Sequence, residues 1–585
     1  MPSVRITRFA GLLPEVAPRL LREDHAQIAH NTLLWDGYLR PLPGWQQISV
    51  ADGTITSIFA TPAATSQGYG ISVTLFDAQQ AGTEPFIFRS LWGIYILDGS
   101  LRYYDGYANQ VGIPNKLLVA PIFTQTQNIT PQHRSVYPAQ RTYALTYMAD
   151  NKESAPTVFP VLGDSGNLFE GDFVTLNFTF TNRDPEMGIN KARLYRTIVG
   201  LDTGENIQNA RETVFHLVKE FTLSGTNTYG YVDQATADMI PGDRCLTEQF
   251  GPLLVDNPTF VGQSESGWLV VAGTDNTYID RSTIHVSDKF LWHTFALQNF
   301  NAIPDIITDG AIFYDDVFFG TRMRPYHMRI AHNEDPNSES LNIHITPFPD
   351  TYGCVSGTMV ATNFGAMYAS PDGLIALQVN EDDVATKKVA NPGDIINNPV
   401  APVDFGDTLN SAWWNGLFVG FCAGVGYVFV HENSHNNQYP LSQLVTFNPP
   451  PGIQGPSFVT GSSAGGLFAA FGNVLYRWPM PGYGYEAANK LVYRWKSKQF
   501  VMAGGTTFAA AKVVNDADGQ LQFNFYGDGV LIYSVSVFDS EPFRIPAQHN
   551  VITVELEIIG QATVREIHLA TSMRELTETS GTDYA

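Results

Sequence analysis

The sequence predicts an all-β protein, and three observations support this. Among 585 residues, 51 glycines and 35 prolines separate short runs rich in Val, Ile, Phe, Tyr and Thr, which are strand formers. Residues 173–180 and 551–559 alternate apolar and polar side chains, as half-buried strands do. Pairs of apolar runs joined by tight turns also recur about every 45 to 55 residues.

These recurring pairs predict the blades of an irregular β-propeller. Each pair reads as two strands of a four-stranded sheet, and the period is typical of propeller blades. A stacked pair of β-sandwiches is the alternative architecture. The pairs are 90–99, 267–273, 309–320, 359–369, 416–430 and 465–477.

One segment of evenly spaced strands interrupts the repeat and predicts an inserted β-sandwich. Its aromatic strand, its Glu-Ser-Ala-Pro and its Ala-Arg-Leu-Tyr-Arg resemble a fibronectin type III module. A C-terminal β region closes the chain. The expected divisions are an N-terminal assembly segment (1–49), a discontinuous propeller (50–135 and 236–500), the insert (136–235) and the C-terminal segment (501–585).

Two local expectations concern turns and helices. Residues 521–526 alternate and end at Gly527-Asp528-Gly529, which predicts a hairpin. Helical periodicity stands out only over Leu20–Leu34, where Asp24 would cap a short helix, although the same residues could lead into a strand.

Composition excludes several classes of function. Hydrophobic residues make up 44%, which supports a sizeable core, and charged residues only 16%. The formal charge of −23 argues against a groove that grips nucleic acid, because such a groove needs a basic stripe. Three widely spaced cysteines, no secretory signal and no long apolar run predict a soluble, non-secreted protein made in a reducing compartment.

No catalytic motif is present, and the sequence predicts no catalytic residues. A glycosidase needs two carboxylates that face each other across a cleft. The acidic clusters that could supply them are expected to be solvated turns, and Ser370–Leu374 is expected to be a tight turn between blade strands. The clusters are Asp315-Asp316 and Glu381-Asp382-Asp383.

No metal site and no cofactor site are predicted either. The histidines are scattered, and the pair four residues apart lies in a polar loop rather than on a helix face. The run 516–519 matches part of a calcium loop but is expected to be a hairpin turn. The histidines considered are His327, His332, His431 and His435.

A basic stretch with aromatic residues is the one signal for nucleic-acid binding. In a chain of this net charge it is better read as a blade strand with its cations facing outward. Its residues are Lys490, Tyr493, Arg494, Trp495, Lys496 and Lys498.

An ordered set of short motifs spans nearly the whole chain. It opens with Phe9–Pro14, Ala26–Asn31 and Gly37–Gly44. It continues with Ala192–Thr197, Met323–Tyr326, Ser370–Leu374, Trp495–Phe500, Val564–Ser572 and Arg574–Leu576. The set resembles the nozzle, or tail tubular B, proteins of short-tailed bacteriophages.

The resemblance implies a structural virion protein without enzymatic activity or membrane insertion. It implies a propeller-containing subunit that forms a homohexameric ring below the portal and adaptor, extends the channel for DNA ejection, and contacts tail fibre, spike or needle proteins. Genomic DNA would pass without specific binding, and the protein would be made in the host cytoplasm and end in the virion. The chain is shorter than the larger nozzle proteins. A tail-associated propeller that binds or degrades glycans is the alternative.

Overall fold

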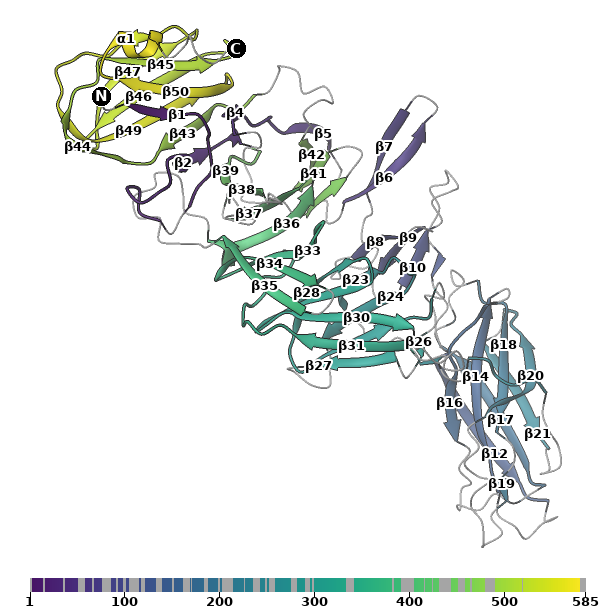
Figure 1. Cartoon of the computed structure of the whole chain (residues 1–585). Helices are drawn as coiled ribbons and strands as arrows, with labels where there is room; N and C mark the ends of the chain where they lie inside the picture. Colours follow the sequence, from purple (N-terminus) through teal and green to yellow (C-terminus); the bar gives the residue numbers. More distant parts are fainter. Residues whose placement is uncertain are drawn as a thin grey trace.

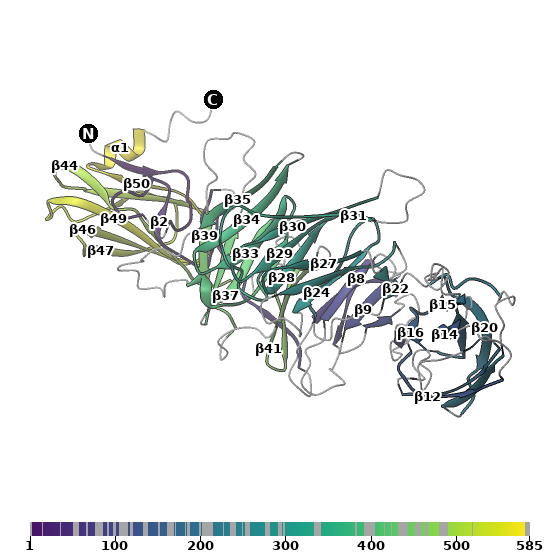
Figure 2. The same ribbon diagram turned by 90° about the horizontal axis from the view of Figure 1, so that it is seen from below.

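The computed structural model describes residues 3–578 with gaps and consists almost entirely of β-strands (Figure 1). The all-β fold class is confirmed. Two views show an elongated chain with a middle of stacked sheets and a separate unit at each end (Figures 1 and 2). The gaps of seven or more residues are 51–57, 76–85, 105–114, 161–168, 202–213, 235–241, 333–340, 391–403, 431–442, 451–457 and 479–489.

The middle is a succession of four-stranded antiparallel sheets, each formed mainly by consecutive strands. The first comprises β8 (Phe86–Ser90), β9 (Gly93–Leu97), β10 (Leu101–Tyr104) and β11 (Asn115–Lys116). The next are β23 (Pro258–Gln263), β24 (Leu269–Thr274), β25 (Ser282–Val286) and β27 (Phe300–Ile303), then β28 (Ile307–Phe313), β29 (Asp316–Thr321), β30 (Tyr326–His332) and β31 (Leu341–Pro347).

Three further sheets follow in the same way. They are β32 (Val360–Ala361), β33 (Gly365–Ser370), β34 (Gly373–Asn380) and β35 (Asp383–Ala390), then β36 (Thr408–Trp414), β37 (Leu417–Cys422), β38 (Val425–Val430) and β39 (Gln443–Phe447), and finally β40 (Phe458–Ser462), β41 (Gly466–Phe471), β42 (Val474–Trp478) and β5 (Gln46–Val50). The N-terminal strand β5 thus completes the last sheet, as in the closure of a propeller ring. A 3₁₀ turn, η4 (Phe405–Asp407), precedes β36.

The sheets contact one another as propeller blades do. The strands β8, β23, β28, β32, β36 and β40 touch in that order, and β40 touches β6 (Ile58–Thr65), which forms a hairpin with β7 (Gly68–Leu75). Successive residues of β29 pack on different neighbours: Phe319 lies with Val270 of one sheet, and Phe318 with Tyr368 of another. Strand side chains alternate between faces, so each sheet shares a core with the sheet on either side. All the predicted pairs of apolar runs lie in these sheets.

The inserted unit is a two-layer sandwich between β11 and β23. One layer has the order β12 (Phe123–Thr130), β17 (Phe173–Phe180) and β21 (Thr228–Asp233). The other comprises β15 (Lys152–Glu153), β16 (Thr157–Pro160), β14 (Thr142–Ala149), β18 (Lys191–Arg196) and β20 (His216–Thr222). The two-residue pair β13 (Ala139–Gln140) with β19 (Gly200–Leu201) completes the strands of the sandwich. The pair β22 (Phe250–Gly251) with β26 (Phe295–Ala296) joins the segment after the sandwich to the blades.

The third part, called here the terminal unit, combines the described residues of 3–45 with those of 490–578. One sheet has the order β1 (Val4–Ile6), β50 (Val564–Ala570), β45 (Ala510–Asn515) and β48 (Phe543–Arg544). The other runs through β2 (Ala26–His30), β43 (Tyr493–Ser497), β49 (Val551–Gly560), β46 (Leu521–Gly527) and β47 (Val530–Val537), with β44 (Phe500–Thr506) beside β49. Because β2 also pairs in parallel with β39, these strands and the blade β36–β39 form one ten-stranded sheet. The pair β3 (Thr32–Leu33) and β4 (Arg40–Pro41) and helix α1 (Met573–Glu578) complete it.

The strand pairing moves three of the expected boundaries. β12 pairs with β17, so the sandwich begins near residue 121 rather than 136. β43 pairs with β2 and β49, so the C-terminal strands begin before 501. The segment 1–49 is no separate unit, because β1 pairs with β50 while β5 joins a blade.

Local structure confirms one turn and corrects two other expectations. Gly527-Asp528-Gly529 joins β46 to β47 as predicted, with a φ of 47° at Asp528 and 81° at Gly529. Residues 516–519 are no hairpin turn, because β45 and β46, which they connect, belong to different sheets. The helix expected over Leu20–Leu34 is wrong: turns lead into β2 and β3, because pairing with β43 and β4 outweighs a weak local periodicity. Within the described residues, no helix is long and apolar enough to cross a membrane.

Candidate functional site: the terminal unit

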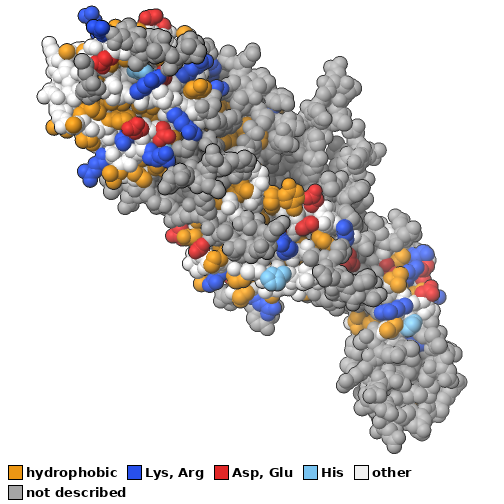
Figure 3. Space-filling view, viewed as in Figure 1, with side chains coloured by type: hydrophobic (Ala, Val, Ile, Leu, Met, Phe, Trp, Pro, Cys, Tyr) orange, Lys and Arg blue, Asp and Glu red, His pale blue; other side chains and the backbone are white. Residues whose placement is uncertain are grey.

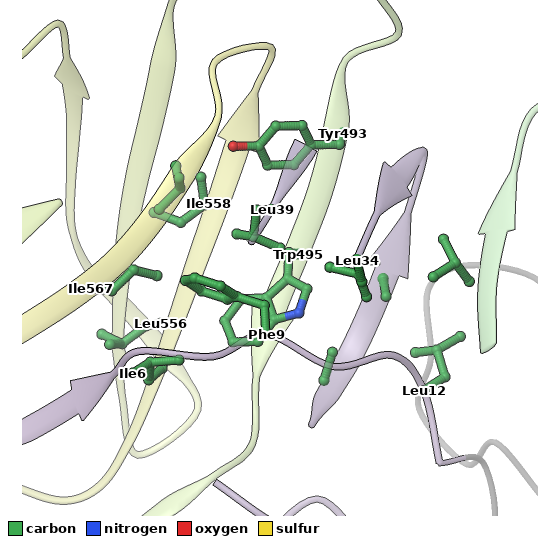
Figure 4. Packing of buried hydrophobic residues seen from close by; sticks show 14 of the residues in the cluster. Ile6, Phe9, Leu12, Leu34, Leu39, Tyr493, Trp495, Leu556, Ile558 and Ile567 are labelled. Carbon is green, nitrogen blue, oxygen red and sulfur yellow. The ribbon is translucent and has the colours of Figure 1, made fainter. Parts of the chain in front are cut away.

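The terminal unit brings the two ends of the chain into one hydrophobic core (Figure 4). Phe9 packs edge-on against Trp495, with ring centroids 5.0 Å apart. The indole Nε1 of Trp495 donates a hydrogen bond to the carbonyl oxygen of Ala10 at 3.3 Å. Leu39 and Ile567 lie in the same cluster, and all these side chains are buried. Neither chain end could bury this apolar surface by itself.

Most of the first and last motifs of the ordered set found in the sequence are parts of this core. The first motif supplies Phe9 and Leu12, and the motif around 495 supplies Trp495. The motif 564–572 forms β50, the partner of β1. Asn31, which ends the second motif, donates from its side chain to the carbonyl oxygen of Val492 at 3.1 Å. Motifs separated by more than 450 residues are therefore neighbours in space.

The basic strand β43 lies at the centre of this unit, and its aromatic and basic residues face opposite sides of the sheet. Tyr493 and Trp495 point into the core. Arg494 pairs with Glu557 at 2.6 Å, and the Lys496 ammonium pairs with Glu555 at 2.6 Å and lies 4.5 Å from the ring centroid of Tyr526. Lys498 lies 5.6 Å from the ring centroid of Phe500.

Glu557 is the most enclosed charge of this arrangement, with 1% of the residue exposed. It accepts hydrogen bonds from Asn524 at 2.8 Å and from the Tyr526 hydroxyl at 2.7 Å. Burial by itself would raise the pKa of Glu557, but these hydrogen bonds and the Arg494 guanidinium outweigh it and hold the pKa below its usual value. Burial and Glu557 together raise the pKa of Tyr526 to about 12.

Carboxylates on the neighbouring strand β49 neutralise the cations of β43. The two carboxylates of β49 occupy Arg494 and Lys496, so the strand presents no uncompensated pair of cations to a phosphate backbone. The prediction of a blade strand is corrected in one respect: β43 belongs to the terminal unit. Its cations lie on the outer side of the sheet, as expected.

The acidic clusters considered for catalysis do not form a facing pair among the described residues. Asp315 accepts hydrogen bonds from the backbone amide and the hydroxyl of Ser266, at 2.9 and 2.6 Å. Asp316 instead binds His327 at 2.7 Å and Arg329 at 3.0 Å across β29 and β30. Glu381 and Asp382 lie outside the described residues, and Asp383 begins β35.

The remaining sequence candidates are explained by local structure. Ser370–Leu374 is the predicted tight turn, joining β33 to β34 with Gly373 at a φ of 134°. His327 is occupied by Asp316, His332 ends β30, and His431 and His435 lie outside the described residues. No group of three potential metal ligands occurs within the described ranges.

Sequence reasoning missed a buried ionic cluster in the sandwich. Asp233 binds Arg196 at 2.8 Å and Arg141 at 3.5 Å, and it accepts a hydrogen bond from the Tyr143 hydroxyl at 2.5 Å. The side chains of the ion pairs are at most 2% exposed. Arg196 ends a strand in which Ala192 and Leu194 are also buried. The alternation of side chains along this strand is the sequence signal that could have indicated a buried Arg196.

It also missed a buried histidine in the blades. His285 of β25 is 1% exposed, and neither ring nitrogen has a hydrogen-bond partner among the described residues. The ring of Phe300 lies against it, with centroids 3.7 Å apart. Burial lowers the pKa of His285 from 6.5 to about 4, so the imidazole is neutral at pH 7.

Comparison with known proteins gives no family. No family model matches the chain, and no curated protein matches it. Among solved structures, an exo-β-1,3-galactanase from Phanerochaete chrysosporium with galactose is 10% identical, covering 53% of this chain and 94% of its own, with a TM-score of 0.17. PorZ, a surface component of the type-IX secretion system of Porphyromonas gingivalis, is 11% identical, covering 89% and 70%, with a TM-score of 0.23. Scores this low carry no argument about function.

Proposed function

We propose that this chain is a structural subunit of the tail nozzle of a short-tailed bacteriophage. Six copies form a ring below the portal and adaptor, and genomic DNA leaves through its channel. The observation that carries the proposal is the ordered motif set, whose outer members fold into one unit although they lie at opposite ends of the chain.

The distribution of charge supports this role. The blades and their connections, residues 46–120 and 234–489, hold 12 Lys and Arg against 30 Asp and Glu. Residues 1–45 and 490–585, which include the terminal unit, hold 13 against 15. Duplex DNA carries one negative charge per about 1.7 Å, so a wall formed by the acidic blades repels it and lets it slide. In the basic strand β43, Arg494 and Lys496 are paired with the carboxylates of Glu557 and Glu555 on β49.

Electron microscopy of the purified protein tests the proposal. We expect rings of six with a channel wider than duplex DNA, about 20 Å across, and no retention of duplex DNA in a mobility assay at physiological salt. Particles that stay monomeric at every concentration tested, or a channel with a basic wall, contradict it.

A polysaccharide-degradation assay separates this function from the glycan alternative. We expect no cleavage, and we expect Asp315→Asn and Asp316→Asn to affect stability at most. Cleavage that these variants abolish while the fold stays intact would assign the chain to the glycosidases.

A further inference from the structure

The strand β47 is the free edge of the long sheet of the terminal unit. It pairs with β46 on one side, and the order of strands ends there within the described residues. Its eight residues read Val-Leu-Ile-Tyr-Ser-Val-Ser-Val, with no charge and no proline. A sheet edge exposes a row of backbone donors and acceptors, and a strand of this composition has no device that keeps a second strand away.

Two other long edge strands carry charged residues. β20 of the sandwich carries Lys219 and Glu220, and β35 of the blades carries Lys387 and Lys388. Charges at a sheet edge oppose pairing with another strand, because pairing would desolvate them. β12 of the sandwich is also an uncharged edge strand, but its exposed side chains are Thr and Asn, whereas those of β47 include Val530 and Leu531.

Two exposed apolar side chains lie at the start of β47, and two more lie on other strands at the same end of the sheet. Val530 and Leu531 are 67% and 49% exposed, and Val501 and Ile552 are 62% and 56% exposed. The Asp528 carboxylate accepts the backbone amide of Ile552 at 3.1 Å, which holds the hairpin turn against the start of β49. β44 pairs with β49 at the same point. Val530 and Leu531 therefore lie on the free edge itself, whereas Ile552 and Val501 lie two and three strands away from it, at the same end of the sheet.

Charge indicates which partner fits this surface. Two copies of a chain of −23 repel each other, and the blades carry most of that charge. The terminal unit is close to neutral, and Figure 3 shows Lys, Arg, Asp and Glu side chains of this unit interspersed with apolar ones. An uncharged edge on a nearly neutral unit is where a second copy can approach with the least repulsion.

We propose that β47, with the exposed side chains Val530 and Leu531 at its start, binds a second copy of this chain, and that a strand of that copy extends the sheet at β47. This inference rests on the proposed function. In a closed ring, β47 of one copy contacts a different surface of the neighbouring copy. Backbone hydrogen bonds of the added strand supply the register, and the apolar end supplies buried area.

The test compares two single substitutions of matched chemistry. Leu531→Lys places a charge on the proposed contact. Val492→Lys adds the same charge to the same unit at a side chain that is 53% exposed and lies outside it. Mass photometry and light scattering over a range of concentrations measure assembly, and circular dichroism with thermal unfolding measures the fold. We expect Leu531→Lys to raise the concentration of half-assembly at least tenfold and Val492→Lys to leave it unchanged.

A second variant covers the case in which Leu531→Lys does not fold. Ser536→Lys puts the charge at an exposed position further along the same edge, away from the apolar end. We expect the same loss of assembly. Normal assembly of a folded β47 variant overturns the inference.

The outcomes keep this inference separate from the proposed function. Rings that form equally well with either β47 variant overturn the contact and leave the nozzle proposal standing. A smaller assembly that still depends on β47 supports the contact and contradicts the ring. A wild-type protein that stays monomeric at every concentration contradicts both.

Discussion

The inserted sandwich and the terminal unit draw their buried contacts from different ranges of the sequence. In the sandwich, Arg141 and Asp233 lie in one continuous segment. In the terminal unit, Trp495 bonds to Ala10, 485 residues away. Loop closure over such a distance gains contacts only after most of the chain is ordered. The sandwich is therefore built as an independent module, whereas the terminal unit depends on both chain ends.

The two units also differ in how far their charged side chains are exposed to solvent. The Arg196 and Asp233 side chains are each 2% exposed, whereas Arg494 is 36% exposed opposite a Glu557 that is 1% exposed. A charge that loses its partner in the sandwich stays buried, whereas Arg494 can turn to solvent. The cost of breaking a pair should therefore be much larger in the sandwich.

The largest expected effect comes from removing whole segments. Replacing 121–247 by a short linker should leave a folded β-rich protein with one cooperative transition, because the sandwich has its own core and residues 242–247 pack on it. Removing 1–45 should abolish folding of the terminal unit, because β1, β2 and Phe9 are part of its core. Calorimetry and circular dichroism measure both. Loss of the cooperative transition in the first deletion would show that the sandwich is integral to the fold.

Asp233→Ala should destabilise the sandwich by roughly 3–5 kcal/mol, because two buried guanidiniums lose their partner. Denaturant unfolding of the full chain, followed by fluorescence, measures the change. Glu220→Ala is the matched control in the same sandwich: its carboxylate pairs with Lys191 and Arg193 near the surface, and we expect a change of at most about 1 kcal/mol. Equal effects of the two variants would show that burial does not decide how much an ion pair of the sandwich contributes to stability.

Burial of the His285 imidazole in the blades should make stability depend on pH. Its pKa is lowered, so the unfolded chain binds the proton more tightly, and stability falls as pH drops from 6.5 towards 4. A shift of this size corresponds to about 3 kcal/mol at most. His285→Leu should flatten this part of the pH–stability curve, whereas His344→Gln, at an exposed position, should leave it unchanged. A curve of unchanged slope in His285→Leu would show that this histidine is not the cause.

Glu557→Gln should have the smallest effect, about 1–2 kcal/mol at pH 7, because Arg494 can be hydrated. The pKa of Glu557 is lowered, so its stabilisation is complete above about 4.5 and is lost as pH falls further. The difference between wild type and variant should therefore shrink at pH 3 in urea unfolding. A difference that is the same at both pH values would exclude the charge as its source.

Much of the architecture could be predicted locally. Alternation over 173–180 and 551–559, and the Gly527-Asp528-Gly529 turn, correctly placed β17, β49 and the hairpin after β46. The spacing of apolar pairs indicated the blades. These features depend on neighbouring residues alone, because side-chain alternation and turn chemistry are properties of a few consecutive residues.

The sequence by itself determined that the chain is all-β, that a hairpin turns at Gly527-Asp528-Gly529 and that the chain is acidic. Only the tertiary structure decided that both ends form one unit, that β12 and β43 belong beyond the expected boundaries, and that Arg494 meets Glu557. It also decided that residues near Leu20–Leu34 form strands, because β43 and β4 are available as partners. Such contacts depend on which distant strands come together, and a local pattern carries no information about its distant partner.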